Sequence, residues 1–308
     1  MGPLSLWFLS RRGGPTLGAA RRWFAWLLLL PGLGSSPVVR GQFATQVVSY
    51  APGLGFATEW GTGAGYTNTA AALGEPSRIT PGEFGGPVDP FNPPYLSSQL
   101  LSVGQGGAVT LALDLPVRND PLHPWGLDFI IFGGAGLVIT NGDYSGGGVS
   151  DGSLFGGGDA VTRVSVSPDG LTFYPLDPGL APAVESGFPT DGRGDFTRPP
   201  GPTGRLSELA GLTLDGIRSR YAGSAGGTAY DLSWARDAAG RPVNLSGAAQ
   251  VRVEVLSGRV EIDGVAAVQA VPEPSVWALG TAGLAGLAGV AVRRAGRAGR
   301  AGRAGRPS

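Results

Sequence analysis

The chain has 308 residues, of which 55 are glycine and 26 proline, and only 15% are charged. This composition suits short strands and tight turns; disorder is the alternative, but a hydrophobic content of 42% in alternating runs favours a folded domain. Because there is no cysteine, no lysine and only one histidine, His123, a disulfide framework, a Schiff-base lysine and a multi-histidine metal site are excluded.

The net charge of zero hides a separation of charge along the chain. Five arginines precede Gln42 and six follow Val292, whereas 12 arginines and, with Glu273 set aside, 22 carboxylates lie between these points. An acidic central region between two basic ends argues against nucleic acid as a partner. It is compatible with calcium, or with simple solubility outside the cell.

Residues 1–41 have the pattern of a signal peptide. Arginines 11, 12, 21 and 22 precede the apolar run 23–30, and small residues follow as far as Gly41. A basic stretch, an apolar stretch and a small-residue exit are typical of export signals. The paired arginines leave open whether the general or the twin-arginine route is used. A short buried helix is the alternative, but nothing amphipathic surrounds the run.

Residues 42–270 are predicted to form one all-β domain. The strands expected from alternating apolar residues are 47–50, 108–115, 127–132, 161–167, 171–174, 228–234, 250–256 and 259–268. The turns 167–170 and 257–258 predict two hairpins. Many short strands, with helix expected only near 206–212, indicate a single jelly-roll-like β-sandwich. The stretch 181–203, with five prolines, is predicted to be a long surface loop.

The C-terminal segment, residues 271–308, has three successive parts. The motif Pro272-Glu273-Pro274 comes first, the uncharged run 276–292 follows, and an arginine-rich repeat that begins with Arg293, Arg294 and Arg297 closes the chain. A helix over 276–292 would be about 25 Å long, which is just enough to cross a bilayer. The arginines are expected to stay on the cytoplasmic side and to leave the β domain outside.

This order of motif, helix and arginines resembles the PEP-CTERM sorting signal of Gram-negative bacteria that make exopolysaccharide. The resemblance implies that Pro272, Glu273 and Pro274 are the sorting motif and that 276–292 is the transmembrane helix, with Arg293, Arg294 and Arg297 as the membrane stop. It also implies an exosortase-like transpeptidase as partner. The precursor would be anchored in the inner membrane and then reach the cell surface or the extracellular matrix. A chance tail anchor is the alternative.

The central region is similar to a domain of bacterial surface proteins to which no activity is assigned. The segments that carry the similarity are Ala72-Leu73-Gly74-Glu75-Pro76, Gly85-Gly86-Pro87-Val88-Asp89-Pro90-Phe91, Gly126-Leu127-Asp128-Phe129-Ile130-Ile131-Phe132, Val164-Ser165-Val166-Ser167-Pro168-Asp169-Gly170, Gly226-Gly227-Thr228-Ala229-Tyr230-Asp231-Leu232 and Ile262-Asp263-Gly264-Val265. Such domains often have a glutamate where this chain has Gly133. The pattern is also distantly similar, as a fold, to galactose-binding-type jelly rolls that serve as carbohydrate-binding modules.

Loop aspartates are the candidate metal ligands. Asp143, Asp151 and Asp159 form the best cluster for a calcium ion, which takes six to eight oxygen ligands. The cluster matches neither an EF-hand nor a nonapeptide calcium repeat, and Asp-Gly pairs also form turns without any metal. We therefore expect no cofactor, with calcium at these three residues as the alternative.

Three other aspartates and the histidine lie in unusual sequence contexts. Asp128, Asp231 and Asp263 interrupt apolar runs, so each is either on a solvent-facing side or buried with partners; for Asp263 ordinary strand alternation is the simpler account. His123 lies in a proline-bracketed loop without a nucleophile elbow elsewhere. It is expected to be a surface residue with no catalytic role.

Trp60, Trp125 and Tyr144 are candidate residues for stacking on sugar rings, with core packing as the alternative for most aromatic residues. The sequence thus predicts an exported, non-enzymatic binding or structural module associated with exopolysaccharide. The alternative is a secreted carbohydrate-active hydrolase that uses paired carboxylates. Facing carboxylates in a deep groove would favour the hydrolase, and a shallow face with exposed rings would favour the binding module.

Overall fold

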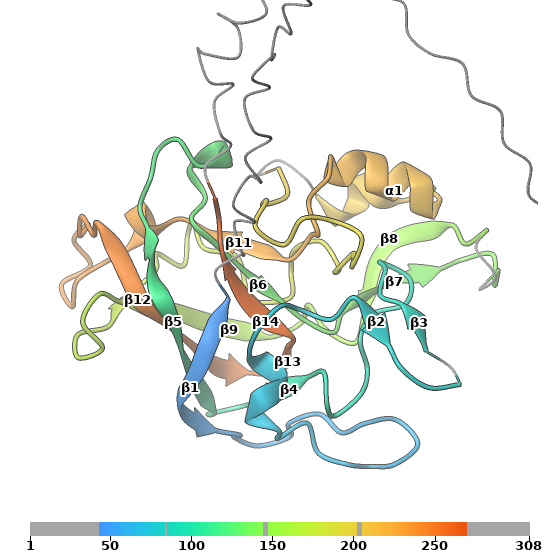
Figure 1. The fold of residues 1–308 in the computed structure, drawn as a ribbon, viewed down its shortest axis with the longest axis horizontal. Helices are drawn as coiled ribbons and strands as arrows, with labels where there is room; N and C mark the ends of the chain where they lie inside the picture. Colours follow the sequence, from blue (N-terminus) through green and yellow to red (C-terminus); the bar gives the residue numbers. More distant parts are fainter. Residues whose placement is uncertain (1–42, 84, 144–146, 202–204, 270–308) are drawn as a thin grey trace, which may run out of the picture. The chain divides into compact units, whose positions relative to one another are not determined.

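The computed structural model describes residues 43–83, 85–143, 147–201 and 205–269, and its regular structure is mostly strand (Figure 1). The all-β class predicted from the sequence is confirmed. The expected signal peptide, sorting motif, membrane helix and arginine tail lie outside the described residues, as does Tyr144. Over the described ranges, no helix has the length and apolar character needed to span a membrane.

A five-stranded antiparallel sheet forms one layer of the domain. Its strands are, in spatial order, β1 (Ala44–Ala51), β5 (Ala108–Arg118), β12 (Gly247–Ser257), β9 (Val161–Ser167) and β10 (Tyr174–Pro175). Strand β12 is central, and its alternating Val251, Val253 and Val255 are buried while the intervening side chains are partly exposed. Successive side chains of a strand point to opposite faces, and this alternation allowed the strand to be predicted from the sequence.

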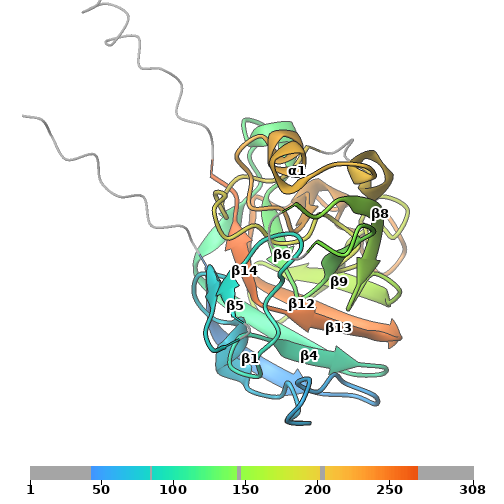
Figure 2. The same cartoon turned by 90° about the vertical axis from the view of Figure 1, so that its right-hand side faces the viewer.

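A second layer packs against the inner face of that sheet. In it, β6 (Phe129–Phe132) pairs with β11 (Thr228–Tyr230) and with β14 (Gly264–Ala267), and β13 (Arg259–Ile262) runs beside β4 (Leu101–Gly104) (Figure 2). All four residues of β6 are buried, as its apolar run predicted. The main hydrophobic core joins the two layers, since it contains Val109 and Val253 from one and Phe129 and Val265 from the other.

Shorter elements flank these layers. Two small ribbons are formed by β2 (Ile79–Thr80) with β3 (Gly86–Pro87) and by β7 (Gly136–Ile139) with β8 (Ser150–Phe155). Helix α1 (Leu214–Tyr221), which the sequence did not predict, buries Ile217 and Tyr221 in a cluster with Leu137 of β7. The 3-10 helices are η1 (Thr69–Ala72), η2 (Pro124–Gly126), η3 (Leu206–Leu209) and η4 (Leu232–Trp234).

One of the two predicted hairpins is confirmed and the other is wrong. Strand β10 pairs with β9 across the turn at 167–170. Strand β12, however, already bonds β5 on one side and β9 on the other, so no edge is free for β13. After Gly258, which has a φ of +77°, the chain therefore passes from the five-stranded sheet to the second layer, where β13 pairs with β4.

Two further expectations are corrected by the fold. The strand expected over 228–234 ends at Tyr230, because the Asp231 side chain accepts a hydrogen bond from the Ser233 N–H and starts η4. The stretch 181–203 contains neither strand nor helix over its described residues, but it is not a surface loop. Phe188 and Phe196 from this stretch are buried.

The first and last described segments lie side by side. Phe43 forms an antiparallel bridge with Ala266 of β14. The Phe43 ring also contacts Phe196 edge-on, with 6.4 Å between ring centroids, and Phe196 in turn contacts Phe132. The chain consequently enters and leaves the β layers at the same place.

Candidate ligand-binding cleft

A cleft of about 420 Å³ opens between the η2 loop, the end of β11 and the loop 180–201. Trp125, Trp234 and Asp231 lie in its lining. The other lining residues are mostly apolar residues and glycines: Leu127, Leu180, Pro182, Ser186, Gly187, Phe188, Pro200, Gly201, Gly227, Thr228 and Ala229. A cleft of this size that combines apolar residues with a small number of polar groups is typical of small-ligand sites.

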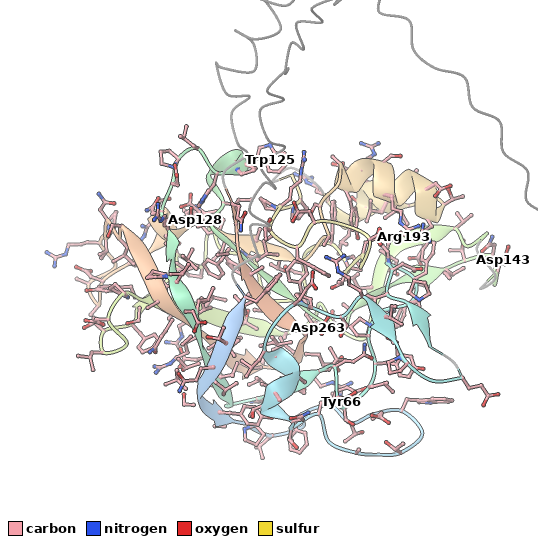
Figure 3. The ribbon with its side chains drawn as sticks, viewed as in Figure 1. Tyr66, Trp125, Asp128, Asp143, Arg193 and Asp263 are labelled. Carbon is pink, nitrogen blue, oxygen red and sulfur yellow. The ribbon has the colours of Figure 1, made fainter. Side chains whose placement is uncertain are left out.

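Trp125 is held in an uncommon backbone conformation at one wall. Its φ of 58° and ψ of 16° lie in the left-handed region, which a bulky side chain rarely adopts. The next residue, Gly126, also has a positive φ, and its N–H donates to the His123 carbonyl at 2.9 Å. This tight turn leaves 51% of Trp125 exposed (Figure 3).

A buried polar pair fastens the Trp125 loop. His123 Nδ1 lies 2.8 Å from Asp128 Oδ1, and Asp128 Oδ2 accepts a hydrogen bond from the Leu232 N–H at 2.9 Å. Burial raises the pKa of Asp128, although the hydrogen bonds from Leu232 and His123 oppose the shift. The pair therefore ties η2 to η4 beneath the cleft. His123 is only 6% exposed, so the prediction of a surface histidine was wrong.

Asp231 presents a carboxylate oxygen near the Trp125 loop. Its Oδ1 accepts the Ser233 N–H at 2.6 Å and so caps η4. Its Oδ2 lies on the side of Gly126 where a side chain would be, 3.9 Å from the place that a Cβ would take. Of the cleft's lining residues in the described part of the chain, Asp231 alone carries an ionisable side chain.

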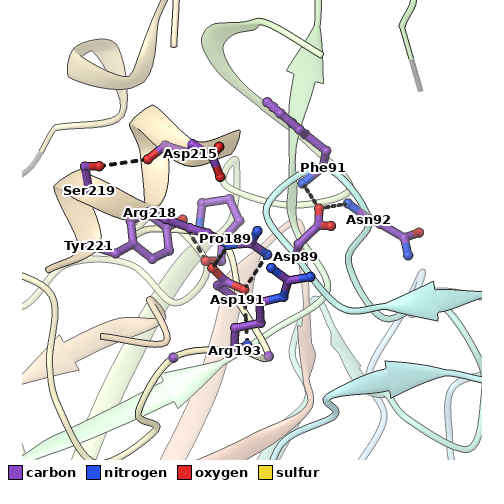
Figure 4. A network of polar contacts seen from close by, with 12 residues as sticks. Asp89, Phe91, Asn92, Pro189, Asp191, Arg193, Asp215, Arg218, Ser219 and Tyr221 are labelled. Atoms are coloured by element: carbon purple, nitrogen blue, oxygen red, sulfur yellow. Dashed lines mark hydrogen bonds and ion pairs between the residues drawn. The ribbon is translucent and has the colours of Figure 1, made fainter. Parts of the chain in front are cut away.

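A second polar network holds the loop that carries Phe188 (Figure 4). Asp191, which is 2% exposed, forms a two-pronged ion pair with Arg218 of α1, with N–O distances of 2.7 and 3.1 Å. Tyr221 donates its hydroxyl to the Pro189 carbonyl at 2.8 Å and stacks on Phe188, a lining residue, with 5.0 Å between centroids. Helix α1 thereby fixes the loop that carries Phe188.

The aromatic residues predicted from the sequence are not brought together. Trp60 is 82% exposed on a turn between Thr58 and Gly65, which form a bridge. Tyr66, next to this turn, and Trp125 lie on opposite sides of the domain (Figure 3). Trp234 was missed as a candidate, because it falls in a run that the pattern assigned to a strand.

The three candidate calcium ligands do not form one site. Asp143 precedes β8, Asp151 lies within it, and Asp159 follows it, so the three residues are distributed along this strand and beyond both its ends. Asp151 bonds the Ser153 N–H and hydroxyl, and the Asp159 cleft is distinct from the one that Asp143 lines. Over residues 43–83, 85–143, 147–201 and 205–269, no group of three or more His, Cys, Asp or Glu is placed to hold a metal.

Two of the aspartates in apolar runs are buried with partners. Asp128 is described above. Asp263 is 2% exposed, and its oxygens accept the Ser77 N–H at 2.7 Å and the Ser77 hydroxyl at 2.8 Å. Simple alternation was therefore the wrong account of Asp263. Burial raises its pKa to about 7.

Comparison with known proteins gives no family. No family model matches the chain, and no curated protein matches it. A solved structure described as a pectin binding carbohydrate binding module, from a monoclinic crystal form, aligns with 75% of this chain and 96% of its own length. The identity is 12% and the TM-score 0.24. At that TM-score the likeness carries no argument about fold or ligand.

Proposed function

We propose that this protein is an exported jelly-roll-like β-sandwich that binds exopolysaccharide at the Trp125 cleft and catalyses no reaction. The observation that carries the proposal is the exposed Trp125 ring, in a cleft with Trp234, on a loop fastened by the buried His123–Asp128 pair. Sugar rings present apolar faces that stack on indole. A loop fixed before binding also loses less conformational entropy when the ligand arrives.

Trp60 provides a matched control for testing this proposal. Both tryptophans are exposed, but Trp60 lies outside the cleft. The full chain, purified in mild detergent, is applied to a glycan array with and without calcium, alongside Trp125→Ala and Trp60→Ala. We expect Trp125→Ala to lose most binding, since stacking contributes about 1 kcal/mol or more beyond burial, and Trp60→Ala to bind like the parent. Equal loss in both variants, or no binding by the parent, would refute the proposal.

We further propose that the two ends of the chain sort it to the cell surface or extracellular matrix. Residues 1–41 would act as the signal peptide, and Pro272, Glu273 and Pro274 would be read by an exosortase-like transpeptidase while 276–292 holds the precursor in the inner membrane. Support comes from the order of these segments and from the arginines at both ends.

The sorting proposal is tested by changing the sorting motif and the membrane-stop arginines in separate variants. In a host with the processing enzyme, Glu273→Ala should leave the chain in the membrane fraction, whereas the parent should be cut and leave that fraction. Replacing Arg293, Arg294 and Arg297 with serine should weaken retention of the precursor instead. A parent chain that stays in the cytosol with both ends intact would exclude this route.

A carbohydrate-active hydrolase is the second candidate, because Asp89 and Asp143 line one cleft of about 510 Å³. Two carboxylates across such a cleft are the minimum that glycoside hydrolysis needs. Against it, Asp89 Oδ1 already accepts the N–H groups of Phe91 and Asn92 at 2.9 and 3.0 Å. Release of reducing sugar by the parent, abolished in Asp89→Asn and in Asp143→Asn, would favour the hydrolase over the binding module.

A further inference from the structure

The charge of the Trp125 cleft restricts the ligand that it accepts. Asp231 supplies a negative charge there, and no arginine is among the lining residues that the structure describes. Of the two oxygens of Asp231, Oδ1 accepts the Ser233 N–H, while Oδ2 has no hydrogen-bond partner among the described residues. One carboxylate oxygen is therefore available to a ligand.

The surroundings reinforce this negative charge. Arg236, two residues after Trp234 in the chain, donates from Nε and Nη2 to Asp177 Oδ2 at 3.1 and 2.8 Å, so its charge is already paired. Residues 42–270 have 12 arginines against 22 carboxylates. An anionic polymer would be repelled at long range and again at Asp231.

A free amino group fits the unused carboxylate oxygen. An ammonium donates charge-assisted hydrogen bonds, which are stronger than those between neutral groups. It is also attracted to the face of an indole ring. We propose that the cleft, if it binds polysaccharide as argued above, selects glycans with free amino groups, with Asp231 Oδ2 accepting from the ammonium and Trp125 stacking on the sugar ring.

Three oligosaccharide probes test the selection. Glucosamine oligomers and their N-acetylated counterparts differ only in the acetyl group, and galacturonate oligomers of equal length serve as the anionic comparison. All three are titrated into the full chain in detergent at low and high salt. We expect the amino form to bind about tenfold more tightly than the acetylated form at low salt. High salt should reduce this preference, and the galacturonate oligomer should bind most weakly.

Asp231→Asn isolates the carboxylate without removing the cap of η4, since asparagine also caps helix starts. Asp169→Asn is the matched control. Asp169 Oδ1 accepts N–H groups from Leu171 and Thr172 in a turn outside the cleft, so this change removes the same charge elsewhere. We expect Asp231→Asn to bind amino and acetylated forms about equally and Asp169→Asn to keep the parent's preference.

The outcomes separate this inference from the proposed function. Equal affinity for amino and acetylated oligomers in the parent, or tighter binding of galacturonate, overturns the inference but leaves polysaccharide binding in place. A preference that survives in Asp231→Asn removes Asp231 from the proposed role. Failure of every probe, together with a blank glycan array, overturns both proposals.

Discussion

Glu185 Oε2 accepts a hydrogen bond from the backbone N–H of Glu261 at 2.8 Å, so two carboxyl-bearing residues meet inside the domain. Glu185 Oε1 accepts the Gly134 N–H at 2.8 Å, and a Cβ at Gly133 would lie 2.5 Å from that oxygen. The carboxylate of Glu185, from a distant loop, therefore occupies the space that a side chain at position 133 would need.

These buried acids predict that stability falls as the pH rises. Burial raises the pKa of Glu185, with the negative charge of Glu261 adding to the shift, and burial also raises the pKa of Glu261. Asp263 behaves alike, with a pKa of about 7. A carboxyl group whose pKa is raised in the folded state stabilises the fold fully at a pH below its unfolded-state pKa, which is 3.8 for Asp and 4.5 for Glu. This stabilisation is lost as the pH rises through the folded-state pKa.

We therefore expect the urea midpoint of unfolding to decrease between pH 5 and pH 8. The free energy of unfolding should fall by about 1.4 kcal/mol for each unit by which folding raises a pKa. Asp263→Asn should flatten part of this slope while keeping a partner for Ser77. Below pH 4 the trend should reverse, because exposed Asp169 and Asp177 have lowered pKa values through backbone hydrogen bonds. A midpoint that stays constant from pH 5 to 8 would contradict the prediction.

Two buried tyrosines should respond oppositely to loss of the hydroxyl. The Tyr230 hydroxyl is buried without a partner among the described residues, whereas that of Tyr221 bonds the Pro189 carbonyl. Tyr230→Phe should be neutral or stabilising, and Tyr221→Phe should cost about 1–2 kcal/mol because a buried carbonyl loses its donor. Urea unfolding of the two variants measures the difference; equal destabilisation would count against this assignment of contacts.

Glycine substitutions separate backbone strain from collision. Gly227 and Gly240 have φ values of +83° and +76°, but only a Cβ at Gly227 would meet the core, 2.5 Å from Ile130 Cγ2. Gly240→Ala should therefore cost about 1 kcal/mol from strain alone, and Gly227→Ala should cost at least 1 kcal/mol more through overpacking. Thermal unfolding compares the two variants, and a smaller loss for Gly227→Ala would show that the core yields.

The partly buried ion pair between Asp191 and Arg218 should contribute more to stability than a surface pair. Arg218→Met leaves Asp191 buried without its counter-charge, and we expect a loss of about 3–5 kcal/mol. Arg241→Met removes an exposed pair with Asp237, for which we expect almost no loss of stability, because water screens the attraction between the two charges. Chemical unfolding is the measurement, and comparable losses would indicate that Asp191 finds another partner.

Local patterns predicted the strands because burial follows alternation along the chain. The valines of β12 and the apolar run of β6 were identified for this reason. Pairing across long distances had no such signal. The turn before β13 resembles a hairpin turn, yet only the occupied edges of β12 determine that β13 pairs with β4.

The candidate site was predictable only in part. Trp125 was identified because an aromatic residue beside prolines and glycine indicates a loop. Its partners were not, since His123 and Asp128 meet through a turn that depends on the left-handed conformation of Trp125 itself. Glu185 gave no signal either, because its burial follows from the packing of a proline-rich stretch that the composition assigned to the surface.

The bridge between Phe43 and Ala266 places both connections of the domain at one point. A tether attached at either connection would thus hold the domain from the same spot. Severing one of them would leave the domain held at that same place by the other.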